Sequence, residues 1–140
     1  MSKVAVVYWS GTGNTEAMAM AVAEGAKGKG AEVSVITAAE FSPEQVSEYS
    51  AIAFGCPSMG SEQLEESEFE PMFTACEGRL SGKNIALFGS YGWGDGEWMR
   101  SWGSPCNDDG ANLACDSVIC NEAPDDDALA ACRELGASLA

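Results

Sequence analysis

The stretch VAVVYWSGTGNT, residues 4–15, decides the fold. Val4 to Trp9 form a near-continuous apolar run, which is typical of a strand buried on both faces of a parallel sheet. A glycine-rich turn follows at once, and a helical pattern continues from about Asn14 to Lys27. A buried strand, a tight turn and a helix in this order predict the first unit of an α/β domain.

The rest of the chain alternates strands and helices in the same way, without an internal repeat or linker. We therefore predict one domain over residues 1–140, with a parallel sheet covered on both sides by helices. Ligands of such sheets bind beyond the carboxyl ends of the strands, so we expect the site in the loops after the first, third and fourth strands. The later predicted strands cover residues 32–37, near an edge of the sheet, and residues 51–55, 84–89 and 113–120. Further helices are predicted around residues 42–45, 69–76 and 97–102, and a last helix is predicted to begin at Asp125.

The chain of 140 residues is strongly acidic, with 22 acidic residues, 7 basic ones and a net charge of −15. Such a surface repels nucleic acid and anionic lipid, and it attracts proteins with basic docking patches, although solubility alone is an alternative reason for the charge. No apolar run reaches the roughly 20 residues that span a bilayer. We expect a cytoplasmic protein that binds neither nucleic acid nor membrane.

The chain has six cysteines, none of them in a C-x-x-C pair, and no histidine. This pattern argues against a zinc or iron–sulfur site, so we predict no metal. Without histidine, hydrolysis by a Ser-His or Cys-His pair is excluded. Scattered thiols in a cytosolic chain are expected to behave as small buried apolar groups.

The loop after the first strand has the composition of a phosphate site. Its glycines allow backbone N–H groups to turn inward at a helix N-terminus, and Ser10, Thr12, Asn14 and Thr15 add neutral donors. It lacks the lysine of a P-loop, and Glu16 stands where a dinucleotide fingerprint needs glycine. The loop therefore predicts binding of a terminal phosphate monoester without cationic side chains. A turn that holds no ligand is the alternative.

Three segments and their spacing resemble the FMN-binding loops of flavodoxins: WSGTGNTE (9–16), GCPSMGSE (55–62) and FGSYGWGDG (88–96). The resemblance continues at residues 68–71 and 121–125 and covers essentially the whole chain. The fifth strand lacks a long inserted loop, so the chain looks like the short-chain branch. The resemblance implies a flavodoxin-like three-layer α/β/α sandwich, with a five-stranded parallel sheet in the order 2-1-3-4-5 and non-covalent FMN at the switch point.

The resemblance also implies roles for particular residues. The four donors of the first loop match phosphate contacts, Ser90 matches a phosphate or ribityl contact, and Asn121 matches a more distant ribityl contact. The predicted cofactor-binding residues are Trp9, Ser10, Gly11, Thr12, Gly13, Asn14, Thr15, Pro57, Ser58, Met59, Gly60, Glu62, Ser90, Tyr91, Gly92, Trp93, Gly94 and Asn121, and no catalytic residue is predicted.

Around the flavin ring, the resemblance assigns Met59 and Trp93 to the two faces, where a thioether and an indole are suited to stacking. Trp93 as a packed surface aromatic is the alternative. Glu62 matches the acceptor for the pyrimidine edge, and backbone N–H groups near Gly92 match donors to that edge. The carbonyl of Gly60 matches the group that turns toward the reduced ring, so Gly60→Ala is expected to lower the semiquinone yield; a plain turn glycine is the alternative.

The implied function is that of a low-potential one-electron carrier, rather than an enzyme, that shuttles between semiquinone and hydroquinone. Uncompensated phosphate charge and nearby carboxylates make the second electron harder to add. The expected partners are reductases and ferredoxin-dependent enzymes with basic docking surfaces, and the expected state is a monomer. An FMN-dependent NAD(P)H:quinone or flavin reductase and an accessory protein of one metalloenzyme are alternatives. The acidic residues that follow the third strand, which also suit a solvated helix face, are Glu62, Glu65, Glu66, Glu68 and Glu70.

Overall fold

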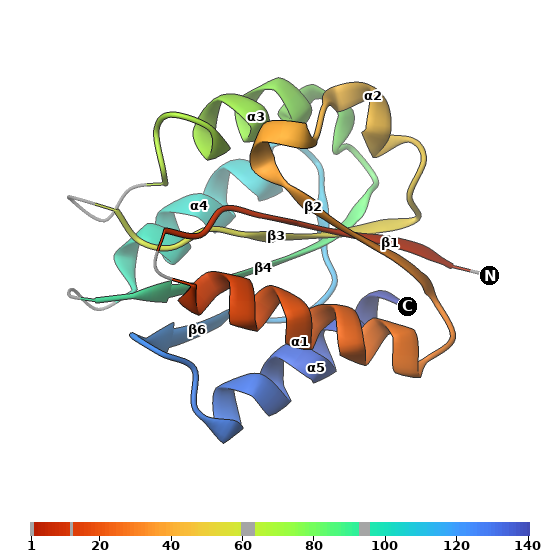
Figure 1. Ribbon diagram of the computed structural model, residues 1–140. Helices are drawn as coiled ribbons and strands as arrows, with labels where there is room; N and C mark the ends of the chain where they lie inside the picture. Colours follow the sequence, from red (N-terminus) through yellow and green to blue (C-terminus); the bar gives the residue numbers. More distant parts are fainter. Residues whose placement is uncertain (1, 12, 60–63, 93–95) are drawn as a thin grey trace.

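The computed structural model describes residues 2–11, 13–59, 64–92 and 96–140, and Figure 1 shows their arrangement. Strands and helices alternate along the chain, as the sequence predicts. The elements, in chain order, are β1 (Lys3–Tyr8), α1 (Asn14–Gly28), β2 (Glu32–Thr37), the 3-10 turn η1 (Ala38–Glu40), α2 (Pro43–Val46), β3 (Ala51–Gly55), α3 (Phe69–Cys76), the 3-10 turn η2 (Glu77–Arg79), β4 (Asn84–Tyr91), α4 (Glu97–Asp108), β5 (Asn112–Leu113), β6 (Val118–Asn121) and α5 (Asp126–Leu139).

The sheet has the strand order β2-β1-β3-β4-β5, and every described strand pair is parallel. This order confirms the predicted topology, with β2 at one edge. The order reverses between β1 and β3, so the chain leaves their carboxyl ends toward opposite faces of the sheet, which opens a crevice there. The carboxyl edge lies on the left of Figure 1, whereas β1 begins and α5 ends at the opposite edge.

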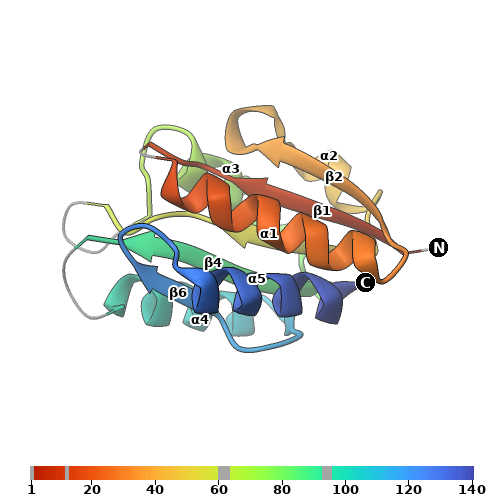
Figure 2. The same ribbon diagram turned by 60° about the horizontal axis from the view of Figure 1, so that its bottom comes forward.

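Helices cover both faces of the sheet, which gives the three layers that were predicted. Helices α1 and α5 lie side by side on one face, and α2, α3 and α4 lie on the other (Figures 1 and 2). Along β1, Val4 and Val6 enter the core under α1 and α5, while Ala5 and Val7 enter the core under the other helices. This double burial explains why β1 is a continuous apolar run. No helix of the described residues is long and apolar enough to cross a membrane.

The fifth strand differs from its prediction as one strand over residues 113–120. Two short strands stand in its place, and both pair with β4: β5 at its beginning and β6 at its end. Between them the chain leaves the ladder after Ala114, whose N–H still donates to the Ile85 carbonyl at 2.9 Å. Asp116 and Ser117 are exposed there. Both residue types are poor strand formers, so this stretch turns to solvent instead of pairing.

Helix α4 extends beyond the predicted Glu97–Trp102 and passes Pro105 to end at Asp108. Trp98, Trp102 and Cys106 are spaced by four residues and are all buried. This apolar stripe holds the helix on the sheet and outweighs the backbone hydrogen bond that proline cannot make. The prediction that Trp98 and Trp102 serve helix packing is confirmed by this burial and by the edge-on contacts of Trp102 with α3.

A pair of carboxyl groups joins the end of α3 to the end of α4. One oxygen of Asp109 is buried and has no hydrogen-bond donor among the described residues. Glu77 lies beside the Asp109 carboxyl group, and burial, followed by a hydrogen bond with Asp109 and the charge of Asp109, raises the pKa of Glu77 from 4.5 to about 7. A protonated Glu77 can donate to Asp109, so this contact depends on a shared proton.

Replacing Glu77 by glutamine is expected to stabilise the protein at pH 8, by ~1 kcal/mol, and to leave it unchanged at pH 4.5. The folded-state pKa of Glu77 is raised, so its contribution is present below pH 4.5 and is lost as the pH rises through about 7. An amide donates at either pH. Urea unfolding at both pH values checks this, with Glu48→Gln at an exposed position as the control. If the two variants change the free energy of unfolding by the same amount at each pH, Glu77 and Asp109 do not share a proton.

Candidate functional site: a crevice at the switch point

A cavity of about 430 Å³ opens at the carboxyl edge of the sheet, where β1, β3 and β4 end. This volume lies within the range of small-molecule and cofactor sites. Its lining combines aromatic and other apolar surfaces with hydroxyl and amide groups, as a flat ring with a polar tail requires. The lining residues are Trp9, Gly11, Asn14, Pro57, Ser58, Met59, Ser90, Tyr91, Gly92 and Glu122.

The loop after β1 leads directly into α1, so its N–H groups gather at a helix N-terminus. Gly13 adopts a left-handed backbone (φ 94°), and its N–H donates to Ser10 Oγ at 3.1 Å. A side chain at this φ is strained, which accounts for glycine here. Helix α1 begins at Asn14 with no side-chain cap, so its first amides remain available to an anion.

Beneath the loop, two buried hydroxyl groups join β4 to the first turn of α1. Thr15 and Ser90 are 1 % and 4 % exposed, and their Oγ1 and Oγ atoms lie 3.0 Å apart. The Ser90 N–H also approaches Thr15 Oγ1 at 3.4 Å. The bond between the two hydroxyls uses one of their two hydrogens, so one of them keeps a hydrogen that can be donated to a ligand while this bond is kept. This pair is a neutral donor set of the kind that the sequence predicts for a phosphate.

Backbone hydrogen bonds hold the three loops together. The Trp9 N–H donates to the Gly55 carbonyl at 3.1 Å, and the Ser58 N–H donates to the Ser90 carbonyl at 2.9 Å. A Cβ on Gly89 would lie 2.1 Å from the Cys56 carbonyl oxygen, so only glycine allows this approach. The sheet therefore presents the loops after β1, β3 and β4 as one continuous surface.

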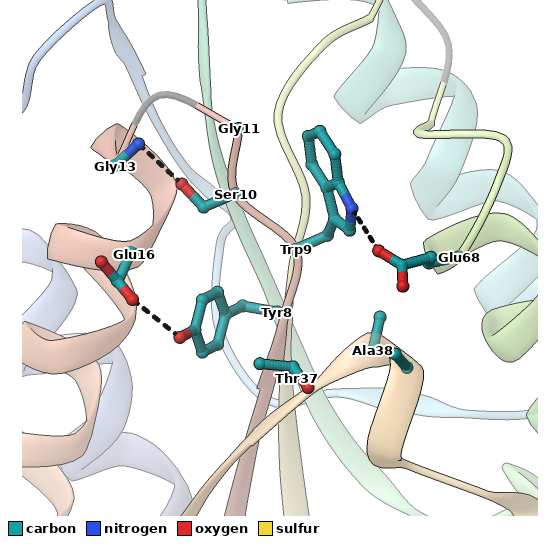
Figure 3. Close-up of a pocket in the computed structure, with 10 residues that line it drawn as sticks. Tyr8, Trp9, Ser10, Gly11, Gly13, Glu16, Thr37, Ala38 and Glu68 are labelled. Carbon is teal, nitrogen blue, oxygen red and sulfur yellow. Dashed lines mark hydrogen bonds between the residues drawn. The ribbon is translucent and has the colours of Figure 1, made fainter.

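A second cavity, of about 440 Å³, lies on the other side of Trp9, toward the end of β2 (Figure 3). Two carboxylates border it, and each accepts a hydrogen bond from an aromatic donor. Trp9 Nε1 donates to Glu68 at 2.9 Å, and the Tyr8 hydroxyl donates to Glu16 at 3.0 Å. Burial, followed by the hydrogen bond to Glu16, raises the pKa of Tyr8. Ser10 and Gly13 line this second cavity, together with Trp9 and Gly11.

The structure brings most of the predicted cofactor-binding residues to this edge. Nine line the first cavity, and Ser10, Gly13 and Thr15 lie in the loop or directly beneath it. Asn121 pairs with Tyr91 in the sheet and is exposed, but it does not line either cavity. The predictions for Thr12, Gly60, Glu62, Trp93 and Gly94 lie outside the described residues.

Glu122 lines the first cavity and was not among the predicted site residues. It has a left-handed backbone (φ 59°), and its N–H donates to the Tyr91 carbonyl at 2.7 Å. The available signal was its position, because it directly follows a parallel strand at the carboxyl edge.

The charge around the two cavities is negative or neutral. Among the described residues, no lysine or arginine lines either of them, whereas Glu16, Glu68 and Glu122 do. Glu65 is one of the acidic residues after the third strand that were expected to face solvent, but its side chain is buried. Burial raises the pKa of the Cys56 thiol to about 12, which agrees with a packing role rather than a redox one. Among the described residues, no group of three or more histidine, cysteine or acidic residues could hold a metal ion.

Fold and site together define a doubly wound α/β protein with a cofactor crevice at its switch point. The family model described as flavodoxin matches residues 6–136. A flavodoxin from Megasphaera elsdenii is 45 % identical over 98 % of both chains, and one from Clostridium beijerinckii is 42 % identical over 96 % of this chain and 97 % of the relative. The solution structure of two-electron reduced Megasphaera elsdenii flavodoxin matches with a TM-score of 0.90 and 46 % identity, covering 97 % of each chain. The chain belongs to the flavodoxin family.

Flavodoxins bind FMN and carry electrons between proteins, and they are not themselves enzymes. The described lining fits this cofactor: Asn14 and Ser90 offer an amide and a hydroxyl donor, and Met59 offers an apolar surface. The chain is accordingly an FMN-binding electron carrier. The alternative of an NAD(P)H:quinone or flavin reductase is not favoured, since the two relatives with 45 % and 42 % identity over nearly the full length of both chains are flavodoxins.

Proposed function

We propose that the chain is a low-potential carrier that accepts and releases electrons one at a time. The observation that supports this most directly is a cavity with neutral donors at its proposed phosphate end and no cationic side chain among the described residues that line it. FMN, when bound there, supplies a ring that accepts single electrons. The protein leaves the phosphate charge uncompensated, so each added negative charge on the cofactor is opposed.

The phosphate end of the site is formed by the loop after β1 and by Ser90. Ser10, Asn14 and Thr15 donate side-chain hydrogen bonds there, with Thr12 proposed beside them on sequence grounds alone. The position of Asn14 at the start of α1 supports this, because the first N–H groups of a helix lack intrahelical partners. The partial positive charge of the helix N-terminus adds to these bonds.

The ring lies farther along the crevice, against the loops after β3 and β4. Met59 is 36 % exposed, and it lines the cavity together with Tyr91. A thioether that reaches solvent can cover the outer part of a flat ring and still leave the ring edge open to a partner. Met59 and Trp93 are the proposed stacking residues, Gly60 and Glu62 are proposed at the ring edge, and Asn121 is proposed near the ribityl chain.

Carboxylates near the site affect both the reduction potential of the cofactor and the docking of partner proteins. Glu68 directly precedes α3 and Glu70 lies in its first turn, and both are exposed. Their charge opposes a second electron on the cofactor and attracts partners with basic surfaces, such as reductases and ferredoxin-dependent enzymes. The six cysteines are all unpaired, which supports work in a reducing compartment, the cytoplasm. The chain acts there as one domain and as a monomer.

The test is a stepwise anaerobic reduction of the FMN-loaded protein, followed by visible absorption. We expect two one-electron steps with well-separated midpoint potentials. A single two-electron step, together with oxidation of NADPH in the absence of an added reductase, contradicts the carrier and favours reductase chemistry. An unchanged NADPH concentration accompanied by two separate steps supports the carrier.

A further inference from the structure

Cys56, which directly follows β3, and Glu65, which lies shortly before α3, are joined by a hydrogen bond. The backbone N–H of Glu65 donates to Cys56 Sγ at 3.3 Å, which joins the two residues across eight intervening positions. Cys56 is itself held firmly: its N–H donates to the Phe88 carbonyl at 3.1 Å, and Trp98 Nε1 donates to its carbonyl at 3.1 Å. Cys56 is therefore tied to β4 and α4.

The Glu65 carboxylate makes a second set of hydrogen bonds, to the beginning of α3. It is 5 % exposed and accepts hydrogen bonds at 2.8 Å from the N–H groups of Ser67, Glu68 and Phe69, in addition to one from the Ser67 hydroxyl. Burial alone raises its pKa, but these donors bring the pKa below its ordinary value. The carboxylate thus stays charged and caps α3 from a position four residues before the helix begins.

A second connection leads from the cap to the cavity. The backbone of Glu68 is held by Glu65, and the Glu68 side chain accepts the hydrogen bond of Trp9 Nε1 at 2.9 Å (Figure 3). Trp9 lines the cofactor cavity. Ser58 and Met59, which follow Cys56 in the chain, line it too. The cap is therefore connected to the cavity from two sides.

We propose that Glu65 is a positioning residue that holds Ser58 and Met59, just after β3, and the indole of Trp9 in the geometry that binds the cofactor. This inference rests on the proposed function, since it assigns Glu65 a part in the same site. Glu65 does not touch the cavity, so it acts through Cys56 on one side and through Glu68 on the other. Its charge is needed because four donors converge on two oxygens, and an amide has only one oxygen to accept them.

Glu65→Gln is the decisive variant, and Glu66→Gln is its matched control. Glu66 is the next residue and is exposed, so the two variants remove the same charge from adjacent positions. We expect Glu65→Gln to weaken FMN binding about tenfold and to narrow the separation of the two one-electron potentials, because charge-assisted bonds are lost. Glu66→Gln is expected to leave FMN affinity within about twofold, since exposed charges interact weakly.

Hydrogen exchange of the apoprotein tests the cap without the cofactor. The amides of Glu68 and Phe69 are expected to exchange faster in Glu65→Gln and at the wild-type rate in Glu66→Gln. Faster exchange with unchanged FMN affinity and potentials overturns the positioning role and leaves a helix cap only. Identical behaviour of the two variants overturns it as well.

Ser67→Ala provides a milder test if Glu65→Gln does not fold. It removes the hydroxyl donor to Glu65 and keeps every charge, so a smaller loss of FMN affinity in the same direction supports the proposal, and no loss contradicts it. Failure of the proposed function has a different signature: the wild-type protein itself then takes up both electrons in one step, whatever the exchange rates of the variants.

Discussion

Replacing Gly136 by alanine is expected to destabilise the protein by ~3 kcal/mol, because α1 and α5 meet there without space for a side chain. A Cβ on Gly136 would lie 1.9 Å from the carbonyl oxygen of Val22. The contact is reciprocal, since a Cβ on Gly25 would lie 1.9 Å from the carbonyl oxygen of Arg133. Both obstacles are backbone atoms, so the two helices, side by side in Figure 2, have to separate.

Urea unfolding of the apoprotein measures this effect, and Gly103→Ala is its control. Gly103 lies within α4, and a Cβ there would meet nothing within 4 Å. Alanine in an open helical position is expected to stabilise the fold by ~0.5–1 kcal/mol, since glycine loses more backbone entropy. The two substitutions are chemically identical and are expected to act in opposite directions. If both variants lose stability, the effect of Gly136→Ala has a cause other than the close contact between α1 and α5.

The second large effect is expected at the phosphate end of the crevice, where Thr15→Val should weaken FMN binding about thirtyfold, equivalent to ~2 kcal/mol. Valine keeps the shape of threonine but cannot donate a hydrogen bond. Its methyl group also leaves the buried Ser90 hydroxyl without its partner at 3.0 Å. Fluorescence titration of the apoprotein with FMN measures the change in affinity.

Riboflavin, which lacks the phosphate, separates a local effect from a general one. If Thr15 donates to the phosphate as proposed, Thr15→Val should bind riboflavin as the wild type does. Thr74→Val, at an exposed position on α3, is expected to change neither affinity. Equal weakening of FMN and riboflavin would show that Thr15 supports the fold of the loop rather than the phosphate.

Much of this architecture could be predicted from local sequence, because each signal has a local physical cause. The run Val4–Val7 is apolar without alternation, since β1 is covered on both faces. The glycine-rich loop predicts the turn, since Gly13 needs a left-handed backbone and α1 begins one residue later. Asp125 predicts the start of α5, and its carboxylate does accept the N–H of Ala128 at 2.8 Å.

The rest depends on contacts between distant residues, which a local pattern does not contain. The fifth strand divides because β4 offers partners to its two ends and not to the polar residues between them. Thr15 and Ser90 are 75 positions apart, so their contact follows from topology. Glu65 resembles its exposed acidic neighbours in the sequence. Only the fold reveals that several N–H groups converge on its carboxylate.

The two ends of the described chain lie at the edge of the sheet opposite the crevice, which matters when the domain is fused to another protein or attached to a surface. Strand β1 begins and helix α5 ends at one edge of the sheet, and the cofactor loops occupy the other (Figure 1). A linker at either end therefore leaves the flavin side uncovered. Tethering α5 to an electrode should present the redox-active face to solution, whereas a tether at the crevice loops should block it. Attachment and electron exchange would thus take place at opposite edges of the sheet.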